Sequence, residues 1–240
     1  MDNPIREVYS SDFIKIEEGP TRGIFRILFV YSNRPIINSL LKTKIIQGGT
    51  SSDTYRVLQF KASSVKSLNQ FREEMKLKTG SQALPINIAA HITMTLVEQL
   101  NYLITHESHT IIGYNPDNII VINDKKFAFL GSDSAIEIKD NMCQISYPFT
   151  KTDFYVSPEL LNIKELPSYV HYKTAYFSLA CLIVGVLLVD DDYYKDYLRH
   201  GKSENIMEYL NKHHIVNTKL YWLLSRCLID DPTKRRILLL

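Results

Sequence analysis

The sequence predicts an α+β protein, with a small antiparallel sheet in its first ~60 residues and a mostly helical remainder. Between Phe13 and Tyr31, apolar and polar residues alternate on both sides of a Gly-Pro turn, which is typical of a hairpin. From Val65 onward the spacing of apolar residues changes to about 3.6, the period of a helix. With 240 residues, 45% of them apolar and 22% charged, the chain is long enough to bury its own core.

The β-rich part is predicted to continue beyond this hairpin. Residues 32–43 (SNRPIINSLLKT) leave room for a short helix of two or three turns. Two strand-like runs, 44–47 (KIIQ) and 55–60 (YRVLQF), flank the polar loop GGTSSDT. These runs are expected to extend the antiparallel sheet.

Two helices and a second hairpin are predicted next. Residues 67–76 place three apolar side chains on one helical face, and 86–106 repeat this pattern long enough to form the longest helix. The runs IIVI and FAFL on either side of NDKK predict two short strands. The stretch that follows, up to Thr152, has no period and is expected to be a long loop.

The chain is predicted to be helical again from Pro158, with an apolar helix around Ser178 and a last helix at 218–228. The apolar run 176–189 is shorter than the ~20 residues that span a bilayer, so we expect a core helix and no membrane insertion. The N-terminus contains acidic residues and no apolar stretch, so no secretory signal is expected.

Charge and cysteine content argue against several classes of function. The chain has 28 Lys+Arg against 26 Asp+Glu and a formal net charge of +2, which provides no field to hold nucleic acid. The three cysteines, at wide spacing, are expected to be reduced and mostly buried. His and Cys do not occur at the spacing of zinc ligands, so no metal site is expected.

Four motifs in a fixed order resemble those of the protein-kinase family. The sequence YNPDNIIV at 114–121 resembles the catalytic loop, and YVSPE at 155–159 resembles the A-P-E that ends the activation segment. FSLA at 177–180 is similar to the family's W-S-x-G, and DPTKR at 231–235 is similar to its D-P-x-x-R. Any one motif alone is weak, but four in the right order are a specific signal.

This resemblance implies a bilobal protein-kinase-like fold in a single domain, 1–240. A truncated, β-rich N-lobe is expected at 1–62 and a helical C-lobe at 63–240. The Glu of A-P-E pairs with the Arg of D-P-x-x-R in that fold. The resemblance therefore implies a structural ion pair between Glu159 and Arg235.

In the same alignment, the residues at the catalytic positions lack the side chains that phosphoryl transfer needs. Phosphoryl transfer needs a base Asp, a metal-binding Asp and a Lys on the third strand. These positions align with Gly113, Gly131 and Phe29, and the Lys of the catalytic loop aligns with Asn115. Asn118 keeps the family's Asn and is interpreted as a residue that hydrogen-bonds within its loop. The resemblance implies a pseudokinase with no catalytic residue, no metal and no cofactor.

The small lobe is shortened as well. Only about a dozen residues separate Phe29 from Lys44, too few for the family's long αC helix. Gly19 and Gly23 lie too close to Phe29 to form a phosphate-binding loop and are interpreted as turn residues. Ala175 stands where the family has an acidic residue in helix αF.

Among pseudokinases, the chain resembles the mixed lineage kinase domain-like family, which executes necroptosis. The sequence YVSPE at 155–159 and KTAYFSLA at 173–180 are similar to that family's motifs, and SNRP at 32–35 is compatible with it. The composition, rich in Ile, Lys, Asn and Tyr, fits a poxvirus-encoded homologue that lacks the four-helix domain. This resemblance implies a decoy in the host cytoplasm, monomeric when free, that sequesters receptor-interacting protein kinase 3 and inhibits necroptosis.

Two segments are candidates for contact with the partner, because exposed aromatic side chains are enriched at interfaces. Core packing is the alternative for one or two of the tyrosines, and Ser146 is either a phosphorylation site or an ordinary loop residue. The partner-binding candidates are Ser146, Tyr147, Phe149, Tyr193, Tyr194 and Tyr197.

Two other functions stay open. One is a pseudokinase scaffold or allosteric regulator of another kinase. The other is an atypical active kinase in which Asp117 or Asp133 serves as a displaced base.

Overall fold

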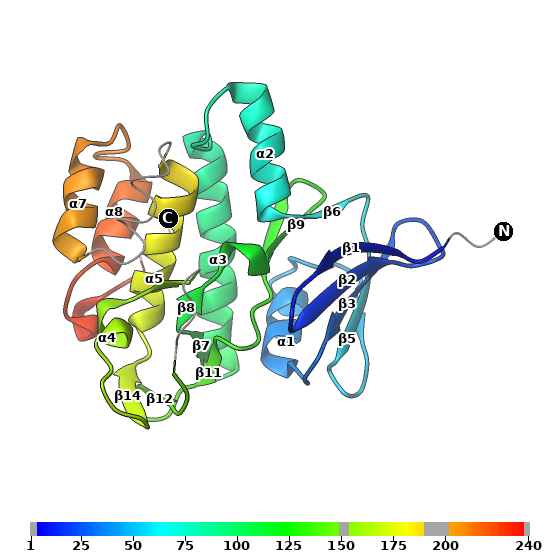
Figure 1. Cartoon of the computed structure of the whole chain (residues 1–240), viewed down its shortest axis with the longest axis horizontal. Coiled ribbons are helices and arrows are strands. Elements are labelled where there is room, and N and C mark those ends of the chain that lie inside the picture. Colours follow the sequence, from blue (N-terminus) through cyan, green and yellow to red (C-terminus); the bar gives the residue numbers. More distant parts are fainter. Residues whose placement is uncertain (1–3, 149–153, 190–201, 238–240) are drawn as a thin grey trace.

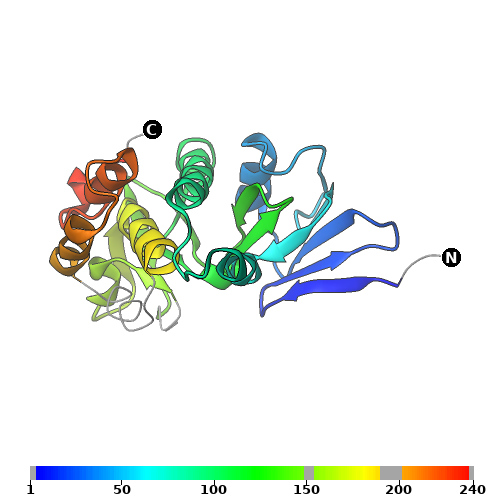
Figure 2. The same ribbon diagram turned by 90° about the horizontal axis from the view of Figure 1, so that it is seen from above.

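The computed structural model describes residues 4–148, 154–189 and 202–237. They form an α+β structure with an antiparallel sheet and a short helix at one end and most helices at the other (Figures 1 and 2). The longest helix, α3 (Ile86–His106), lies between these two parts. The α+β class predicted from the sequence is thus confirmed.

The sheet has five strands in the order β1-β2-β3-β5-β4, and every neighbouring pair is antiparallel. The predicted hairpin is confirmed, because Ile16 of β2 pairs with Ile27 of β3. Both side chains are buried, so the alternation in the sequence marks the face that enters the core. The strands are β1 (Arg6–Ser10), β2 (Ile14–Glu18), β3 (Ile24–Phe29), β4 (Thr50–Ser51) and β5 (Val57–Lys61).

Helix α1 (Arg34–Lys42) follows β3 and confirms the short helix predicted there. The side chain of Asn33 accepts a hydrogen bond from the Ile36 amide, so it caps the first turn. Ile36, Ile37 and Leu40 are fully buried in the core that α1 shares with the sheet.

The strand predicted at 44–47 is wrong. The segment is a turn that begins at Lys44, whose φ of 58° is outside the strand region. Ile45 and Ile46 are both buried, whereas consecutive strand residues point to opposite faces. Two adjacent buried isoleucines therefore fill the core from a turn.

Helix α2 (Leu68–Thr79) and helix α3 confirm the two helices predicted after residue 65. Ser67 and Gln70 form a reciprocal capping box at the start of α2. The helix ends at Gly80, whose φ of 76° suits a residue without a β-carbon.

The second predicted hairpin is also confirmed, as β9 (Ile119–Ile122) and β10 (Lys126–Phe129). Strand β6 (Val65–Ser67) pairs with the other edge of β9, so three strands form a sheet beside α3. This sheet carries the segment that precedes Gly131.

The long loop predicted up to Thr152 is wrong over its described part. It contains β11 (Ala135–Glu137) and β12 (Met142–Ile145). Strand β11 pairs with β7 (His109–Ile111), and β12 pairs with β14 (Ser168–His171). These strands are three or four residues long and their partners are distant in sequence, so no local period reveals them.

The last part begins with α4 (Pro158–Leu161) and the buried helix α5 (Thr174–Leu182), which continues as the π-helical turn η2 (Ile183–Leu188). No helix of the described residues is long and apolar enough to cross a membrane. The remaining elements are β8 (Gly113–Tyr114), η1 (Pro116–Asn118), β13 (Tyr155–Val156), α7 (Ser203–Lys212), α8 (Lys219–Cys227) and η3 (Pro232–Lys234).

One hydrophobic core runs from the five-stranded sheet through α1 and α3 to the helices at the other end. A smaller cluster lies under β12, β13 and β14 and includes Cys143, Phe154 and Val170. All three cysteines are free and buried, as predicted. Burial raises the pKa of Cys143 and of Cys227 to about 12, so both thiols stay protonated at neutral pH.

Candidate functional site

The aligned catalytic positions of the helical part come together around η1. The Asn118 amide donates to the Asn115 carbonyl at 3.0 Å, and the Leu130 amide donates to the Asn118 carbonyl at 2.8 Å. Gly113 lies in β8, immediately before this turn, and Gly131 follows Leu130. Four of the five positions predicted from the sequence therefore lie in one compact region without a carboxylate among them.

Gly131 has no room for a side chain. A β-carbon built there would lie 2.5 Å from the ring of Phe129 and 3.1 Å from the Asn118 side-chain nitrogen. Phe129 is fully buried, and its ring packs on Tyr114 with the ring centres 4.9 Å apart. The space that an aspartate would need at position 131 is thus filled by an aromatic ring.

Phe29 lies apart from these four residues, at the end of β3. Its backbone pairs with Ile14, and its side chain is only 3% exposed in the hydrophobic core. An ammonium group would be expensive at such a position. Helix α1, which follows β3, spans nine residues and carries no acidic side chain.

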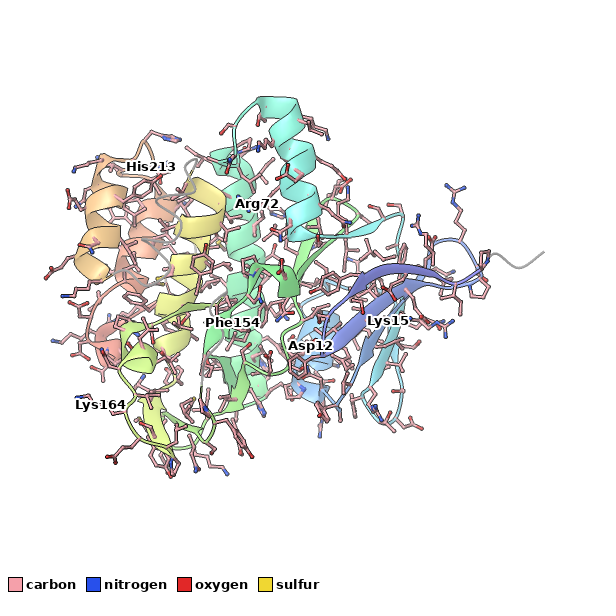
Figure 3. All side chains as sticks on the ribbon, viewed as in Figure 1. Asp12, Lys15, Arg72, Phe154, Lys164 and His213 are labelled. Carbon is pink, nitrogen blue, oxygen red and sulfur yellow. The ribbon has the colours of Figure 1, made fainter. Side chains whose placement is uncertain are left out.

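The β1–β2 turn, at residues 11–13, has no glycine and carries Asp12 on the side that faces the helical part (Figure 3). Burial raises the pKa of Tyr9 in β1, a hydrogen bond with Ser11 opposes this rise, and the negative charge of Asp117 in η1 adds to it.

Asp117, one of the two candidate displaced bases, is already engaged. Its carboxylate accepts a hydrogen bond from the side-chain amide of Asn69 in α2. Its backbone amide donates to the side chain of Asn115 at 2.8 Å. Asp133, the other candidate, lies in the turn between β10 and β11.

A buried glutamine joins the sheet part to the helical part. The side chain of Gln99 in α3 accepts from the Phe129 amide at 2.9 Å and donates to the Phe129 carbonyl at 2.8 Å. It also donates to the Ser39 hydroxyl of α1 at 3.1 Å. Sequence reasoning missed this residue, although a glutamine three residues after Leu96 and four before Leu103 lies on the apolar face of its helix.

The ion pair implied for Glu159 and Arg235 is present. The Arg235 side chain is fully buried, and its terminal nitrogens donate to both carboxylate oxygens of Glu159, one of them at 3.0 Å. Its other N–H groups donate to the carbonyls of Ile229, Asp230 and Lys173. The guanidinium also lies 4.9 Å from the ring centre of Phe177. Every donor of this buried cation is thus satisfied.

Hydroxyl groups form further hydrogen bonds in this part of the molecule. We call the Glu159–Arg235 ion pair and the groups bonded to it the fastening region. Ser178 in α5 donates to the Ile112 carbonyl at 2.8 Å and so holds the segment before Gly113. Ser157 and Thr174 are hydrogen-bonded to each other and buried. Ala175, one turn before Ser178, is fully buried in the hydrophobic core, so its position has no room for a solvated acid.

Only two of the partner-binding candidates can be placed. Ser146 and Tyr147 follow β12 and are exposed, and the Tyr147 side chain is 82% exposed. Sequence reasoning missed a second aromatic residue nearby, Tyr169 of β14, which is 61% exposed. Phe149, Tyr193, Tyr194 and Tyr197 lie outside the described residues.

No group of three or more His, Cys, Asp or Glu side chains among the described residues is arranged to hold a metal ion. A scan against protein-family models and a search of curated protein sequences give no match to the chain.

Proposed function

We propose that the chain is a catalytically inactive, protein-kinase-like binding module that sequesters a protein kinase. One observation carries this proposal. The positions aligned with the catalytic groups are filled by backbone and apolar packing, whereas the ion pair that fastens the kinase-like C-lobe is complete. The polar groups kept by the chain thus serve structure rather than phosphoryl transfer.

The order of elements supports the kinase-like part of the proposal. Helix α1 directly follows β3, as αC follows the Lys-bearing strand of kinases, and the hairpin β9–β10 precedes Gly131 as the corresponding segment precedes D-F-G. The division into a short N-lobe at 1–62 and a C-lobe at 63–240 belongs to the same proposal. Helix α1 covers only ~14 Å at 1.5 Å per residue, consistent with a truncated small lobe.

Packing between the two parts argues against a nucleotide cofactor. Ile14, Ile16 and Ile27 on the inner face of the sheet are at most 1% exposed, and they belong to the core that also contains α3 and β9. The carboxylate of Asp12 in the β1–β2 turn would repel phosphates, which a glycine-rich loop would instead receive with backbone amides.

The surface around β12 and β14 is the best candidate for the partner kinase. Ile145 of β12 pairs with Ser168 of β14, so Tyr147 and Leu166 extend from the same end of this strand pair. Leu166 is 38% exposed, and Tyr169 adds a second exposed ring. All three side chains belong to this strand pair or to the residues beside it, and exposed aromatic and aliphatic side chains are enriched at interfaces.

The family resemblance makes receptor-interacting protein kinase 3 the proposed partner, and inhibition of necroptosis in the host cytoplasm the proposed outcome. The module would be monomeric when free. An alternative role as scaffold or allosteric regulator would use the same surface, but the partner's activity would rise or stay constant instead of being blocked.

Binding of the kinase domain of receptor-interacting protein kinase 3 to the immobilised chain tests this proposal. The double variant Tyr147→Ala/Tyr169→Ala should raise the Kd at least ~10-fold. Truncating an aromatic anchor of an interface costs more than ~1 kcal/mol of binding free energy. The matched control, Tyr31→Ala/Trp222→Ala, removes two other exposed aromatic residues and should bind like the wild type. Absence of binding by the wild type, or equal weakening in both variants, would refute the proposal.

A melting experiment tests the nucleotide part separately. ATP with Mg²⁺ or Mn²⁺ should leave the melting temperature of the chain unchanged. A ligand that binds only the folded state must stabilise it, so a saturable rise with ATP would overturn this part. The atypical-enzyme alternative would instead require phosphate transfer that Asp117→Ala or Asp133→Ala abolishes.

A further inference from the structure

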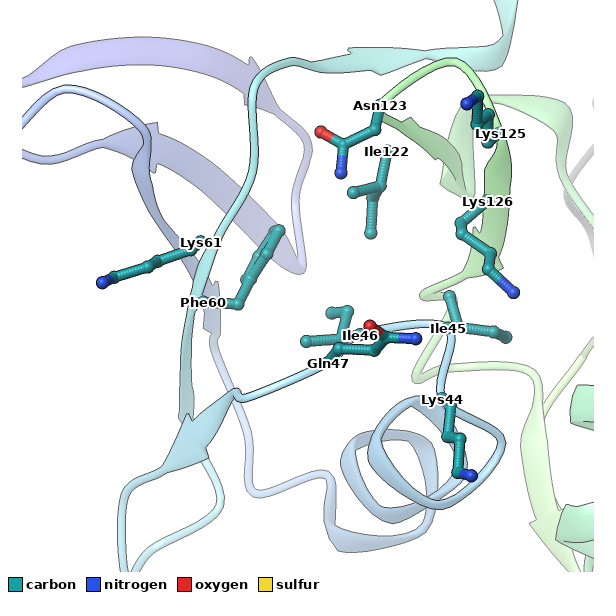
Figure 4. A pocket seen from close by; sticks show the side chains of 10 residues that line it. All are labelled: Lys44, Ile45, Ile46, Gln47, Phe60, Lys61, Ile122, Asn123, Lys125 and Lys126. Atoms are coloured by element: carbon teal, nitrogen blue, oxygen red, sulfur yellow. The ribbon is translucent and has the colours of Figure 1, made fainter.

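A cavity of about 380 Å³ lies where the turn after α1 meets the end of β5 and the β9–β10 turn (Figure 4). Its apolar wall is formed by Ile45, Ile46, Phe60 and Ile122, all of which are at most 3% exposed. The cavity has the size and the apolar lining of small-molecule sites, which usually enclose ~300–1,000 Å³. It lies in the sheet part of the molecule, whereas β12 and β14 lie in the other part.

The mouth of this cavity is basic. Lys44, Lys61, Lys125 and Lys126 line it, and no acidic side chain does. None of the four forms an ion pair with any other residue that the structure describes. The acid of the same turn, Asp124, is paired with Lys66 at 2.9 Å. Clefts lined by one sign of charge focus the field and concentrate ions of the opposite sign.

The lysines and two amides are suited to different parts of a ligand. Figure 4 shows the side chains of Lys44, Lys61 and Lys126 extending outward in different directions, so their stems border the mouth while their ammonium groups reach the solvent around it. The Asn123 side-chain oxygen is occupied by the Ser63 amide at 2.7 Å and the Ser63 hydroxyl at 2.8 Å. This leaves its NH₂ group directed at the cavity, where the Gln47 amide also lies.

We propose that this cavity is a binding site for a small amphipathic organic anion, whose apolar body contacts Ile46, Phe60 and Ile122 and whose anionic group contacts the lysine mouth. Sulfonate, carboxylate and phosphate share the chemistry that the lysines recognise. A small ligand fits better than an acidic peptide, because the apolar wall is confined to one cavity and the charges surround its mouth. This site is independent of the proposed kinase-binding surface.

Fluorescence titration with 8-anilinonaphthalene-1-sulfonate tests the site, because this probe joins two aromatic groups to one sulfonate. Its neutral relative, N-phenyl-1-naphthylamine, has the same aromatic body without the charge. The wild type should bind the sulfonate saturably, more weakly at high salt, and at least several-fold more tightly than the neutral probe. Equal affinity for the two probes would show apolar adhesion only and overturn the proposal.

Variants locate the binding. Lys44→Gln/Lys126→Gln should weaken sulfonate binding about 10-fold, since each exposed charge contributes up to ~1 kcal/mol, and leave the neutral probe unaffected. Lys139→Gln/Lys234→Gln removes two exposed lysines elsewhere and should bind like the wild type. Gln47→Trp, at an exposed position of the mouth, should obstruct both probes without unfolding the chain.

Amide chemical shifts provide a second readout that does not depend on the variants. The sulfonate probe should shift resonances of residues 44–47, 60–61 and 122–126. Shifts confined to other residues, or equal losses of affinity in the two lysine variants, would overturn the site. Displacement of the probe by a poly-glutamate peptide but not by an excess of an aryl phosphate would also overturn it, in favour of an acidic peptide. Each of these outcomes leaves the result of the kinase-binding experiment unchanged.

Discussion

The region around Arg235 and the region around Gly131 differ in whether they contain a buried charge. Arg235 is a fully buried cation whose five N–H donors all have acceptors, and Glu159 supplies the opposite charge. Around Gly131, the sites aligned with charged catalytic groups hold no charge, and the ring of Phe129 fills the space. A buried charge is present where it joins two segments 76 residues apart, and none is present at the positions that the resemblance aligns with catalytic groups.

This difference indicates what each region contributes to the fold. The fastening region connects α4, the start of α5 and the segment after α8. The region around Gly131 contributes apolar packing and the Gln99 connection to α1. Substitutions that remove the charge from the first region, or add charge to the second, should therefore both destabilise the fold.

The largest effect is expected from Arg235→Met. It leaves Glu159 without its partner and strips hydrogen bonds from three carbonyls, so unfolding free energy should fall by about 3–5 kcal/mol. Urea denaturation followed by circular dichroism measures this change. Arg226→Met, on an exposed face of α8, is the matched control and should change stability by less than ~0.5 kcal/mol. A small effect of Arg235→Met would show that the fastening region is not essential.

Phe29→Lys introduces on β3 the residue that the resemblance to protein kinases would place there, and it should destabilise the fold nearly as much. The ammonium group would enter a core position that is 3% exposed, without an acidic partner on α1, and should cost about 2–4 kcal/mol. Phe29→Leu keeps the position apolar and should cost less. The Lys variant should also fail to gain stabilisation by ATP with Mg²⁺. Such a gain would mean that a nucleotide site needs only this one residue.

Gly131→Asp should cost about 1–3 kcal/mol, because the new side chain overlaps the Phe129 ring. Gly131→Ala separates bulk from charge and should account for much of this loss. In a Phe129→Leu background the Gly131→Ala penalty should shrink, since the overlapping ring atoms are gone. Strict additivity of the two substitutions would contradict the contact as the cause.

The sequence was most informative where contacts are local or a motif is strong. The bounds of α3 follow from its apolar period, and the pairing of Glu159 with Arg235 follows from two motifs of the resemblance. Strands β11 and β12 were missed because their partners are distant in sequence. The segment with Ile45 and Ile46 is a turn although its apolar residues predict a strand, because apolar content alone does not specify the backbone conformation.

The candidate site was predictable in composition but not in packing. The absence of carboxylates at 113 and 131 can be read from the sequence, once the motifs are aligned. That the Phe129 ring occupies the space beside Gly131 depends on a rotamer and on a neighbouring turn, which no spacing encodes. The cavity behind β5 is formed by three segments that meet only in the folded chain.

The smallest predicted effect is a pH dependence of the free energy of unfolding. We expect it from the region around Arg235 and not from the region around Gly131. His171 is beside the fastening region, and its ring nitrogen accepts from the Lys173 amide at 3.2 Å. Burial, followed by the positive charges of Lys173 and Arg235, lowers the pKa of His171, although Asp231 and Glu159 oppose this shift. The unfolded chain, with a His pKa of ~6.5, therefore binds the proton more readily than the folded one.

This contribution to stability is complete above pH ~6.5 and is lost as the pH falls through the lower folded value. The free energy of unfolding should thus be greater at pH 7.5 than at pH 5.5, and His171→Gln should flatten part of that slope. Lys173→Met should also flatten it, by removing a charge that lowers the pKa, whereas Gly131→Ala should shift the whole curve without changing its slope. If His171→Gln leaves the slope intact, the pH dependence arises elsewhere, for example at His213, whose pKa is also lowered by burial. If His171→Gln changes the pH slope of the unfolding free energy and Gly131→Ala does not, the pH dependence arises in the region that contains the buried Arg235.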